Sequence, residues 1–333
     1  MKVKVGKIDR IYILKIAIVI LNWNGKSWLE KFLPNVIANS ADSDIYVIDN
    51  ASSDDSVSFL KQRFPSVKII INEKNEGFAG GYNEGLKQVD SEIYCLLNSD
   101  VEVTENWLEP ITTLFKADKN IAAIQPKILD YNRRNYFEFA GAAGGLIDNL
   151  GFPYCRGRIF ENIEEDLGQY NDETEIFWAS GCCLFIRSKD FWEQNGFDAR
   201  FFAHQEEIDL CWRLKNSGKK IYYTGKSTVY HVGGGTLKKE NPRKTFLNIR
   251  NNLSMLLKNL PFPQLIWIIF LRFILDGFAG IYLGYKNGFS HFTAVIKAHF
   301  SFYGQMFQTY KLRQKNQISD FYTEKWLVFK NFL

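Results

Sequence analysis

The chain has 333 residues, of which 46% are hydrophobic and 23% charged, a globular composition with enough apolar residues for a sizeable core. Its net charge of +4 argues against a dedicated nucleic-acid-binding protein. The five cysteines form no C-x-x-C pair, which argues against a structural zinc site or a disulfide framework and fits a reducing compartment.

The N-terminus is charged (MKVKVGKIDR) and leads into the apolar run IYILKIAIVIL. Lys15 interrupts this run, and no small-residue cleavage site follows it. We therefore expect an N-terminal extension over residues 1–14 and no signal peptide.

From residue 15 the chain alternates between apolar runs and helix-like stretches. Strands are predicted at 15–23, 44–50, 67–72 and 92–98, and helices at 27–39, 56–64 and about 79–89. A helix over 106–118 and a strand over 121–129 continue the pattern. This alternation predicts an α/β fold, with a mostly parallel sheet and helices on both of its faces.

Four successive predicted strands end in polar side chains. These are Asn22 and Asn24 on either side of Trp23, Asp49 and Asn50, Asn72, and Asn98 with Ser99 and Asp100. Each group alone is an ordinary turn signal. Because ligands of parallel α/β sheets bind at the carboxyl ends of the strands, the four groups together predict a ligand cleft at one edge of the sheet.

The second half of the chain is less regular. Residues 130–175 are rich in glycine and polar side chains, and we expect a long insertion or a flexible loop there. A strand is predicted at 175–188, then a helix that ends at Gly218 and a strand at 219–225. The run STVYH leads into three glycines, after which the chain is predicted to be helical to its end.

Three candidate chemical sites stand out. Asp100 follows a strand and could bind Mg²⁺ or Mn²⁺ together with nucleotide phosphates, although a plain turn also explains it. Glu206 and Glu207, close to Asp209, could supply a general base with a pKa raised by mutual repulsion, or could simply complement a helix dipole. His231 precedes a glycine cluster, and either a metal ligand or a structural histidine fits it.

The segment NEGFAGGYNEGL (75–86) places glycines just before a predicted helix, where backbone N–H groups can approach a phosphate. It contains no GxGxxG and no GxxxxGK[ST], so a dinucleotide-binding fingerprint and a P-loop are not supported.

Read in order, several segments of the chain resemble family 2 glycosyltransferases of the GT-A fold, and more narrowly their bacterial rhamnosyltransferase-like branch. The segments are IVILNWNG (18–25), VIDNASSDDS (47–56), NEGFAGGYNEG (75–85), LLNSDVEV (96–103), SGCCLFIR (180–187), GFDARFFAHQEEIDLCWRLKNSGKKIYY (196–223) and VYHVGGGT (229–236). The resemblance covers about residues 15–255, and it implies a Rossmann-like GT-A catalytic domain there.

The resemblance also implies roles for single residues. The nucleotide pocket would be lined by Asn22, Trp23, Asp49, Asn50, Asn75, Gly77, Asn83, Asn98, Ser99 and Asp100. Asp100 matches the last acid of the family's DxD motif and would bind Mg²⁺ or Mn²⁺ with His231, while Asn98 replaces the first acid and leaves the strength of metal binding open. Glu207 takes the catalytic-base position, and Glu206 would hold the acceptor or support the site.

The implied reaction is an inverting transfer from a nucleotide-sugar donor, with dTDP-rhamnose as the first candidate. The absence of QxxRW after the base favours one sugar per encounter. Arg243 and Arg250 could add positive charge near the leaving group, although surface arginines need no function. The acceptor expected from the branch is a lipid-linked glycan of surface polysaccharide synthesis, reached at the cytoplasmic, inner face of the cell membrane.

The C-terminal segment, residues 256–333, is predicted to associate with the membrane or to form oligomers such as a homodimer. From Lys258 onward there are nine Lys/Arg and three Asp/Glu, so this part carries +6 and the rest −2. The stretch 261–285 is strongly apolar, but Arg272 and Asp276 interrupt it short of a membrane span, and the two could pair on one helix face. Aromatic and basic residues suit a bilayer interface, while a packed helical appendage is the alternative.

Two other functions fit the same sequence. A polyprenyl-phosphate sugar synthase would use a lipid phosphate as acceptor and would need no general base. A non-catalytic subunit could bind nucleotide sugars or act as a scaffold, which the Asn98 replacement favours and the presence of Asp100, Glu207 and His231 argues against.

Overall fold

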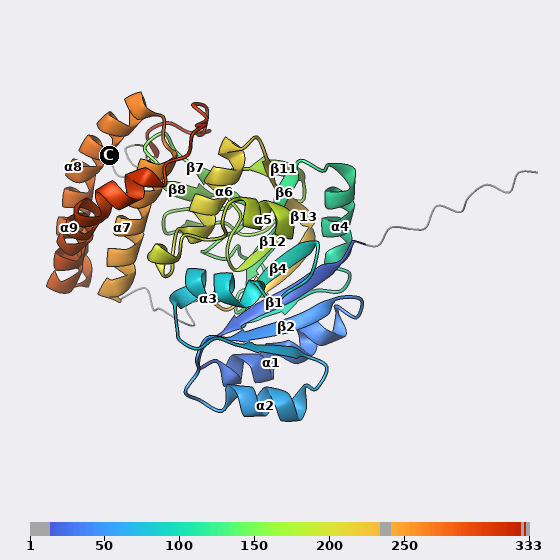
Figure 1. Ribbon diagram of the computed structural model, residues 1–333. Helices are drawn as coiled ribbons and strands as arrows, with labels where there is room; N and C mark the ends of the chain where they lie inside the picture. The colour runs from blue at the N-terminus through green and yellow to red at the C-terminus, as the bar shows by residue number, and fades with distance from the viewer. Residues whose placement is uncertain (1–13, 234–240, 328–329, 331–333) are drawn as a thin grey trace, which may run out of the picture.

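The computed structural model describes residues 14–233, 241–327 and 330 (Figure 1). The predicted extension, apart from Leu14, and the last two glycines of the cluster after His231 lie outside these residues. Within them, a nine-stranded sheet runs in the order β11-β13-β6-β12-β4-β1-β2-β3, with β5 paired to β13. The strands are β1 Ile16–Asn22, β2 Asp44–Asp49, β3 Lys68–Ile71, β4 Ile93–Asn98, β5 Val101–Val103, β6 Ile121–Asp130, β11 Glu173–Ile176, β12 Cys183–Arg187 and β13 Lys220–His231.

The helices alternate with these strands and then follow one another at the C-terminus. They are α1 Lys26–Ala38, α2 Ser56–Arg63, α3 Gly77–Leu86, α4 Leu108–Ala117, α5 Ser188–Glu193, the 3-10 turn η1 Ala199–Phe201, α6 Glu206–Asn216, α7 Pro242–Asn259, α8 Phe262–Asn287 and α9 Phe289–Lys311. The predicted α/β fold with a mostly parallel sheet and C-terminal helices is confirmed.

The central strands are apolar on both faces because helices cover both faces. Along β1, Ala17 and Val19 join one core cluster, and Ile16, Ile18 and Ile20 join the other. The first cluster includes residues of α3, α6 and the C-terminal helices, and the second includes residues of α1, α2 and α4. A strand buried on both sides reads as a continuous apolar run, which is why the sequence predicts β1, β2 and β4 well.

Strand register aligns the polar strand ends. In the parallel pairs of β1, Asn22 lies opposite Asp49 of β2, and Leu21 lies opposite Asn98 of β4. The sheet is mixed on its other side, where β12 runs antiparallel to both β4 and β6. There β13 is parallel to β6 and antiparallel to the short β5, which sets His231 opposite Val101, next to Asp100.

Residues 130–175 are ordered, and the expectation of a flexible loop was wrong. They contain a small antiparallel sheet of β7 Gly145–Ile147, β8 Pro153–Cys155, β9 Arg158–Ile159 and β10 Asn162–Ile163. Strands of two or three residues are too short to show the alternation that identifies a strand in sequence. The predicted strand 175–188 is likewise two strands, β11 and β12, separated by residues 177–182.

Helices α7, α8 and α9 form a layer at one side of the sheet (Figure 1). The boundary predicted after residue 255 falls inside α7. Leu256 of α7, Ile268 of α8 and Phe302 of α9 belong to the same core cluster as residues of α3 and α6, so these helices share a core with the α/β part of the molecule. Helix α9 ends at Lys311, and among the described residues beyond it only Leu327 and Lys330 are helical, so the expectation of helix to the C-terminus holds only in part. Between α9 and Leu327, Phe321 packs on Trp212 with ring centroids 5.0 Å apart.

In the described part of the chain, α8 is the one helix long and apolar enough to cross a membrane, a test that a buried core helix can also pass. Arg272 and Asp276 do not break its apolar surface. Both are buried, and Asp276 Oδ1 accepts a hydrogen bond from Arg272 Nη2 at 3.1 Å, as the spacing of four residues predicts. The charges that interrupt the apolar run in the sequence therefore face inward in the fold.

Candidate functional site

The ends of β1 and β2 form one hydrogen-bonded unit. Asn22 Nδ2 donates to Asp49 Oδ2 at 3.0 Å and lies 3.2 Å from Ser52 Oγ, while Asp49 Oδ1 accepts from the Ser52 backbone N–H at 2.9 Å. Asn22 and Asp49 are almost fully buried, whereas the neighbouring Trp23 is 48% exposed. The arrangement fixes a carboxylate at the strand edge beside an aromatic face open to solvent.

Asparagine side chains at the next strand ends organise the glycine-rich loop. Asn50 Nδ2 donates to Asn75 Oδ1 and to the Gly77 carbonyl, both at 3.0 Å. Asn72 Nδ2 donates to Asn50 Oδ1 at 3.0 Å, and Asn75 Oδ1 also accepts from the Gly77 backbone N–H at 2.8 Å. The predicted pocket residues Asn50, Asn75 and Gly77 therefore lie together, and their mutual contacts set the shape of this edge.

Gly77 requires its glycine. Its φ is +74°, and a Cβ at this position would lie 2.3 Å from the Phe202 carbonyl oxygen. That carbonyl accepts a hydrogen bond from Ala79 N at 3.2 Å. The glycine-rich loop thus packs directly on residues 197–205, the segment that leads into α6.

Asn83 lies farther along α3 and holds the same segment. Its Nδ2 donates to the Phe197 carbonyl at 2.8 Å, and its Oδ1 accepts from Phe197 N at 3.0 Å. Because the oxygen and the nitrogen of its side-chain amide are both hydrogen-bonded to Phe197, Asn83 links α3 to the segment before α6. Its contact with a nucleotide stays a prediction.

Asp100 and His231 are brought together by the β5–β13 pairing. His231 Nε2 lies 3.2 Å from Asp100 Oδ1 and 3.3 Å from Asn98 Nδ2, and both Asp100 and His231 are over nine-tenths buried. Burial by itself would raise the pKa of Asp100, but the hydrogen bond and charge of His231 hold that pKa below its ordinary value. Ser99, between Asn98 and Asp100 in the sequence, is half-buried and lies near Gly25, just before the start of α1.

Glu138 completes this cluster and was missed from the sequence. Its Oε1 lies 3.4 Å from His231 Nδ1, on the side of the ring opposite Asp100. Burial lowers the pKa of His231, but neighbouring Cys182, Glu138 and Asp100 together raise it well above its ordinary value. Glu138 lies in the irregular segment 130–175, where no strand end or motif marks it.

The cluster fits a divalent cation that also binds a ligand. Two ligand atoms 3.2 Å apart, one carboxylate oxygen and one imidazole nitrogen, can share one ion. Glu138 Oε1 lies 3.4 Å from the other ring nitrogen without forming a hydrogen bond to it, close to where a carboxylate orients a metal-binding histidine. No group of three or more His, Cys, Asp or Glu suited to a metal occurs among the described residues, so such an ion would need ligands from a bound molecule, as Mg²⁺ with phosphates does.

The two acids predicted for catalysis begin α6. Glu206 is buried and Glu207 half-buried, and the Oε2 atom of each has no hydrogen-bond partner within the described residues. Burial raises the pKa of Glu207 to about 7, while backbone N–H groups, that of Gly181 among them, lower it in part. Burial, followed by the charge of Glu207, raises the pKa of Glu206 well above its ordinary value. Desolvation is thus a larger cause than the mutual repulsion expected from the sequence.

Glu207 also borders the glycine-rich loop. A Cβ at Gly181 would lie 3.1 Å from Phe78 Cζ and 4.0 Å from Glu207 Cβ, so Phe78 of α3 and Glu207 of α6 flank the same backbone. A carboxylate whose pKa is close to neutral and whose oxygen is free can accept a proton, which is the requirement for a general base.

The segment before α6 is strained and is held by α7. Phe202, His204 and Gln205 have left-handed φ values of 66°, 70° and 72°. Asn251 Nδ2 donates to the carbonyls of Phe201, Ala203 and His204 at 3.0, 3.0 and 2.7 Å.

Arg250 acts on the same segment. Its Nη2 donates to the carbonyls of Arg200 and Phe201 at 2.9 and 3.1 Å. Arg250, considered from the sequence as a source of charge near the leaving group, therefore has a structural partner here.

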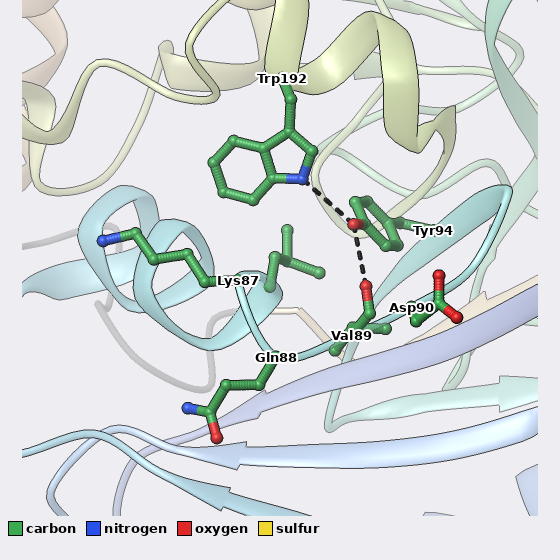
Figure 2. Close-up of a pocket in the computed structure, with 7 residues that line it drawn as sticks. Lys87, Gln88, Val89, Asp90, Tyr94 and Trp192 are labelled. Atoms are coloured by element: carbon green, nitrogen blue, oxygen red, sulfur yellow. Dashed lines mark hydrogen bonds between the residues drawn. The ribbon is translucent and has the colours of Figure 1, made fainter.

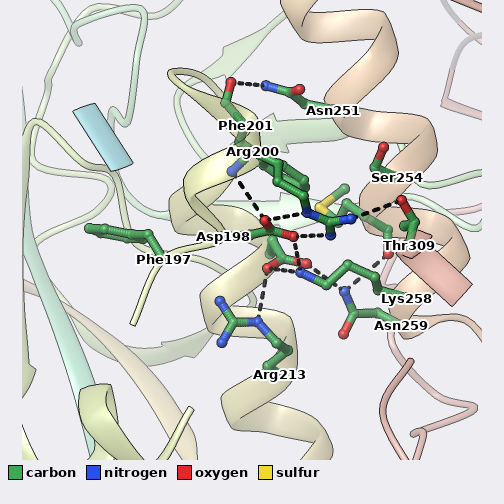
Figure 3. Close-up of polar contacts among 12 residues, drawn as sticks. Phe197, Asp198, Arg200, Phe201, Arg213, Asn251, Ser254, Lys258, Asn259 and Thr309 are labelled. Atoms are coloured by element: carbon green, nitrogen blue, oxygen red, sulfur yellow. Dashed lines mark hydrogen bonds and ion pairs between the residues drawn. The ribbon is translucent and has the colours of Figure 1, made fainter. Parts of the chain in front are cut away.

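A network of ion pairs joins α6 to the segment before it and to α7 (Figure 3). Asp209, fully buried, binds Arg213 Nε and Lys258 Nζ, each at 2.8 Å. Lys258 Nζ lies 2.9 Å from Asp198 Oδ2, which also binds Arg200. Burial would raise the pKa of Asp198, but Arg200 and Lys258 outweigh it and hold that pKa far below its usual range.

A separate pocket lies at the other edge of the sheet (Figure 2). It has a volume of about 460 Å³, and Tyr94, near the amino end of β4, lines it. Trp192 Nε1 donates to Tyr94 Oη at 3.1 Å, and Tyr94 Oη donates to the Val89 carbonyl at 3.1 Å. Because ligands of parallel sheets bind at the carboxyl ends of the strands, this pocket is not the candidate active site.

The sheet topology is that of a GT-A glycosyltransferase, and solved structures agree. The structure of GalNAc-T7 with UDP, GalNAc and Mn²⁺ aligns over 76% of this chain and 49% of its own length, with a TM-score of 0.60 and 16% identity. The mannosyltransferase PcManGT from Pyrobaculum calidifontis, in complex with GDP-Man and Mn²⁺, aligns over 88% of both chains, with a TM-score of 0.55 and 12% identity. At such identities the likeness concerns the fold.

The family follows from sequence comparison. The model of glycosyl transferase family 2 matches residues 17–194, and the chain belongs to this family. The rhamnosyltransferase WbbL of Escherichia coli K12 is 41% identical over 219 residues, which are 62% of this chain and 80% of that protein. The N-acetylglucosaminyl-diphospho-decaprenol L-rhamnosyltransferase of Mycobacterium tuberculosis (strain CDC 1551 / Oshkosh) is 23% identical over 232 residues, 65% of this chain and 75% of that protein. The predicted resemblance to the rhamnosyltransferase-like branch is confirmed.

Proposed function

We propose that this glycosyltransferase moves one sugar, with inversion, from a nucleotide-diphosphate donor to a lipid-linked glycan in surface polysaccharide synthesis. dTDP-rhamnose is the first candidate donor, because two relatives are named rhamnosyltransferases. The lipid-linked acceptor is supported by the mycobacterial relative, whose named acceptor is built on decaprenol diphosphate.

One observation carries the proposal: Glu207 presents a carboxylate oxygen without a partner, and its pKa is raised to about 7. In the proposed reaction this carboxylate accepts the proton of an acceptor hydroxyl. The hydroxyl oxygen forms a bond to the anomeric carbon from the face opposite the nucleotide, and the bond between that carbon and the diphosphate oxygen breaks. Glu206 supports the site or holds the acceptor.

The other predicted residues hold the donor. Asp49, fixed by Asn22 and Ser52, accepts hydrogen bonds from the base or ribose beside the Trp23 face. Asn50, Asn75 and Gly77 shape the loop that approaches the nucleotide.

Asp100 and His231 would hold Mg²⁺ or Mn²⁺, and Glu138 would orient His231. The ion would offset the charge that develops on the diphosphate. Two structural neighbours are in complex with Mn²⁺, which supports a divalent cation here.

We further propose that residues 15–255 act as the catalytic domain and that residues 256–333 associate with the inner face of the cell membrane. The support is the surface of α8 and α9, which exposes Trp267, Phe270 and Phe300 at 74%, 60% and 73%. Large exposed apolar patches mark interaction surfaces, and aromatic side chains suit the interface of a bilayer.

Donor binding tests the proposal. UDP, GDP, dTDP and their sugars would be titrated by calorimetry with and without Mn²⁺, on wild type and on Asp100→Ala. Metal-dependent binding of one nucleotide, lost in Asp100→Ala, is expected. Failure of every nucleotide to bind would remove the donor site and favour a scaffold that keeps only the fold.

A further inference from the structure

A second, apolar groove lies far along the chain from the catalytic acids, between α8 and α9. Its volume is about 580 Å³, within the roughly 300–1,000 Å³ common for small-molecule sites. Its lining includes Phe273, Gly277, Phe278, Ile281, Ile296 and Phe300. Polar side chains contribute little to it, namely His299 and Tyr303.

The groove is preformed, because buried polar contacts fix the two helices. Asp276 Oδ2 lies 3.1 Å from His299 Nε2, across the pair, and Asp276 Oδ1 accepts from Arg272. Arg272 also donates to Asn252 of α7, so α7, α8 and α9 are tied together.

The helix spacing explains where the groove opens. A Cβ at Gly284 would lie 3.0 Å from Phe292 Cβ, so the helices approach closely there. A Cβ at Gly277 would meet nothing within 4 Å, so space remains beside that residue.

The exposed charges of α8, α9 and the residues just after them are all positive. Between Phe262 and Lys315, every exposed charged side chain is a lysine: Lys286, Lys297, Lys311 and Lys315. The acid in this range, Asp276, is buried and paired. Such a surface complements anionic phosphate headgroups at the surface of a membrane.

We propose that the α8–α9 groove binds the prenyl chain of the lipid-linked acceptor. The inference rests on the proposed function, which supplies an acceptor of this class. A hydrocarbon chain leaves no polar group unsatisfied against this lining, whereas a peptide backbone would lose hydrogen bonds to water. The positive charge of α8 and α9 is complementary to the phosphate groups of a lipid surface.

A groove-filling variant tests the inference, and the chain offers a matched control. Gly277→Leu adds a side chain in the groove, and Gly304→Leu adds the same side chain to α9 outside the lining. A Cβ at either position meets nothing within 4 Å, and leucine forms helix better than glycine, so both variants should fold. A thermal melt no lower than that of wild type verifies this.

The probe is a benzophenone-tagged geranylgeranyl phosphate, crosslinked by light to the full-length protein and located by peptide mass spectrometry. We expect labelling within α8 and α9, reduced at least fivefold by Gly277→Leu and unchanged by Gly304→Leu. Untagged geranylgeranyl phosphate should compete with the probe, and phosphatidylglycerol at the same concentration should not.

Equal labelling of Gly277→Leu and wild type, or labelling confined to other segments, would overturn the inference. Equal competition by phosphatidylglycerol would also overturn it, because the groove would then accept any lipid chain. Nucleotide binding by calorimetry, expected to be the same in both variants as in wild type, separates the two proposals. If wild type bound no nucleotide, the donor site would be ruled out, and the labelling result for the groove would stand unchanged.

Discussion

At the scale of single residues, the chemistry depends on where the fold removes water. Glu207 is an ordinary acid in the sequence, and its raised pKa comes first from burial beneath the segments that surround α6. Asp100 and His231 are 131 positions apart, and only the β5–β13 register brings them within 3.2 Å. Motif and strand-end patterns could predict these three residues, but not Glu138, whose role comes from a contact with His231.

The pH dependence of transfer should follow Glu207. The base must be ionised to accept a proton, and its pKa is raised to about 7, so kcat/KM should rise about tenfold per pH unit below 7 and level off above it. Initial rates between pH 5 and 9 check this. A plateau that extends down to pH 5 would argue against Glu207 as the base.

The same burial should cost stability. The unfolded state loses the Glu207 proton near its ordinary value of 4.5 and the folded state near 7, so stability falls as pH rises between these values. Glu207→Gln removes the buried charge, and we expect it to stabilise the protein by on the order of 2–3 kcal/mol at pH 8, with most of the gain gone at pH 5. Denaturant unfolding of wild type and Glu207→Gln at pH 5 and pH 8 measures the change in the free energy of unfolding. The same change at both pH values would show that the charge on Glu207 is not its cause.

At the scale of elements, α7 supports the segment that leads into α6. Asn251 and Arg250 bind carbonyls of the strained backbone before α6, and Lys258 joins Asp198 to Asp209 (Figure 3). The sequence predicted α6 and its acids, because these follow from local spacing. It could not predict the contacts with α7, which join positions about 50 residues apart.

Lys258→Met should therefore destabilise the protein strongly. The change removes the cation shared by Asp198 and Asp209 and leaves two buried carboxylates with less positive charge, at a cost of about 3–5 kcal/mol. Lys286→Met, on the exposed end of α8, is the matched control and should change stability by less than about 0.5 kcal/mol. Similar unfolding midpoints for the two variants would show that the network contributes little.

At the scale of the whole molecule, a GT-A fold is joined to a layer of three helices, α7 to α9. The exposed surface of α8 and α9 is rich in large apolar side chains. The α/β pattern was predictable because strands buried on both faces are apolar throughout. The ordered segment 130–175 was not, because its strands are too short to show a period. The boundary predicted after residue 255 rests on composition, and α7 continues through it because its buried face packs on α6.

Membrane association should depend on charge. Each lysine near an anionic surface contributes about 1 kcal/mol, so replacing Lys297 and Lys311 together by glutamine should weaken binding to phosphatidylglycerol vesicles about thirtyfold. Replacing Lys61 and Lys116, exposed on α2 and α4, should change binding little. Co-sedimentation with vesicles at two salt concentrations measures the binding of both double variants. If the two double variants lost the same binding strength, the α8–α9 surface would not be the membrane-binding surface.

The most direct test of the central claim compares wild type and Glu207→Gln in one transfer assay. The donor is the nucleotide sugar selected by calorimetry, the acceptor is a bacterial lipid extract, and released nucleoside diphosphate is measured. We predict that Glu207→Gln binds the donor as wild type does and that its transfer rate falls by about 10²–10⁴-fold. Transfer within a few-fold of wild type would contradict the account and would favour a lipid phosphate acceptor, which needs no general base.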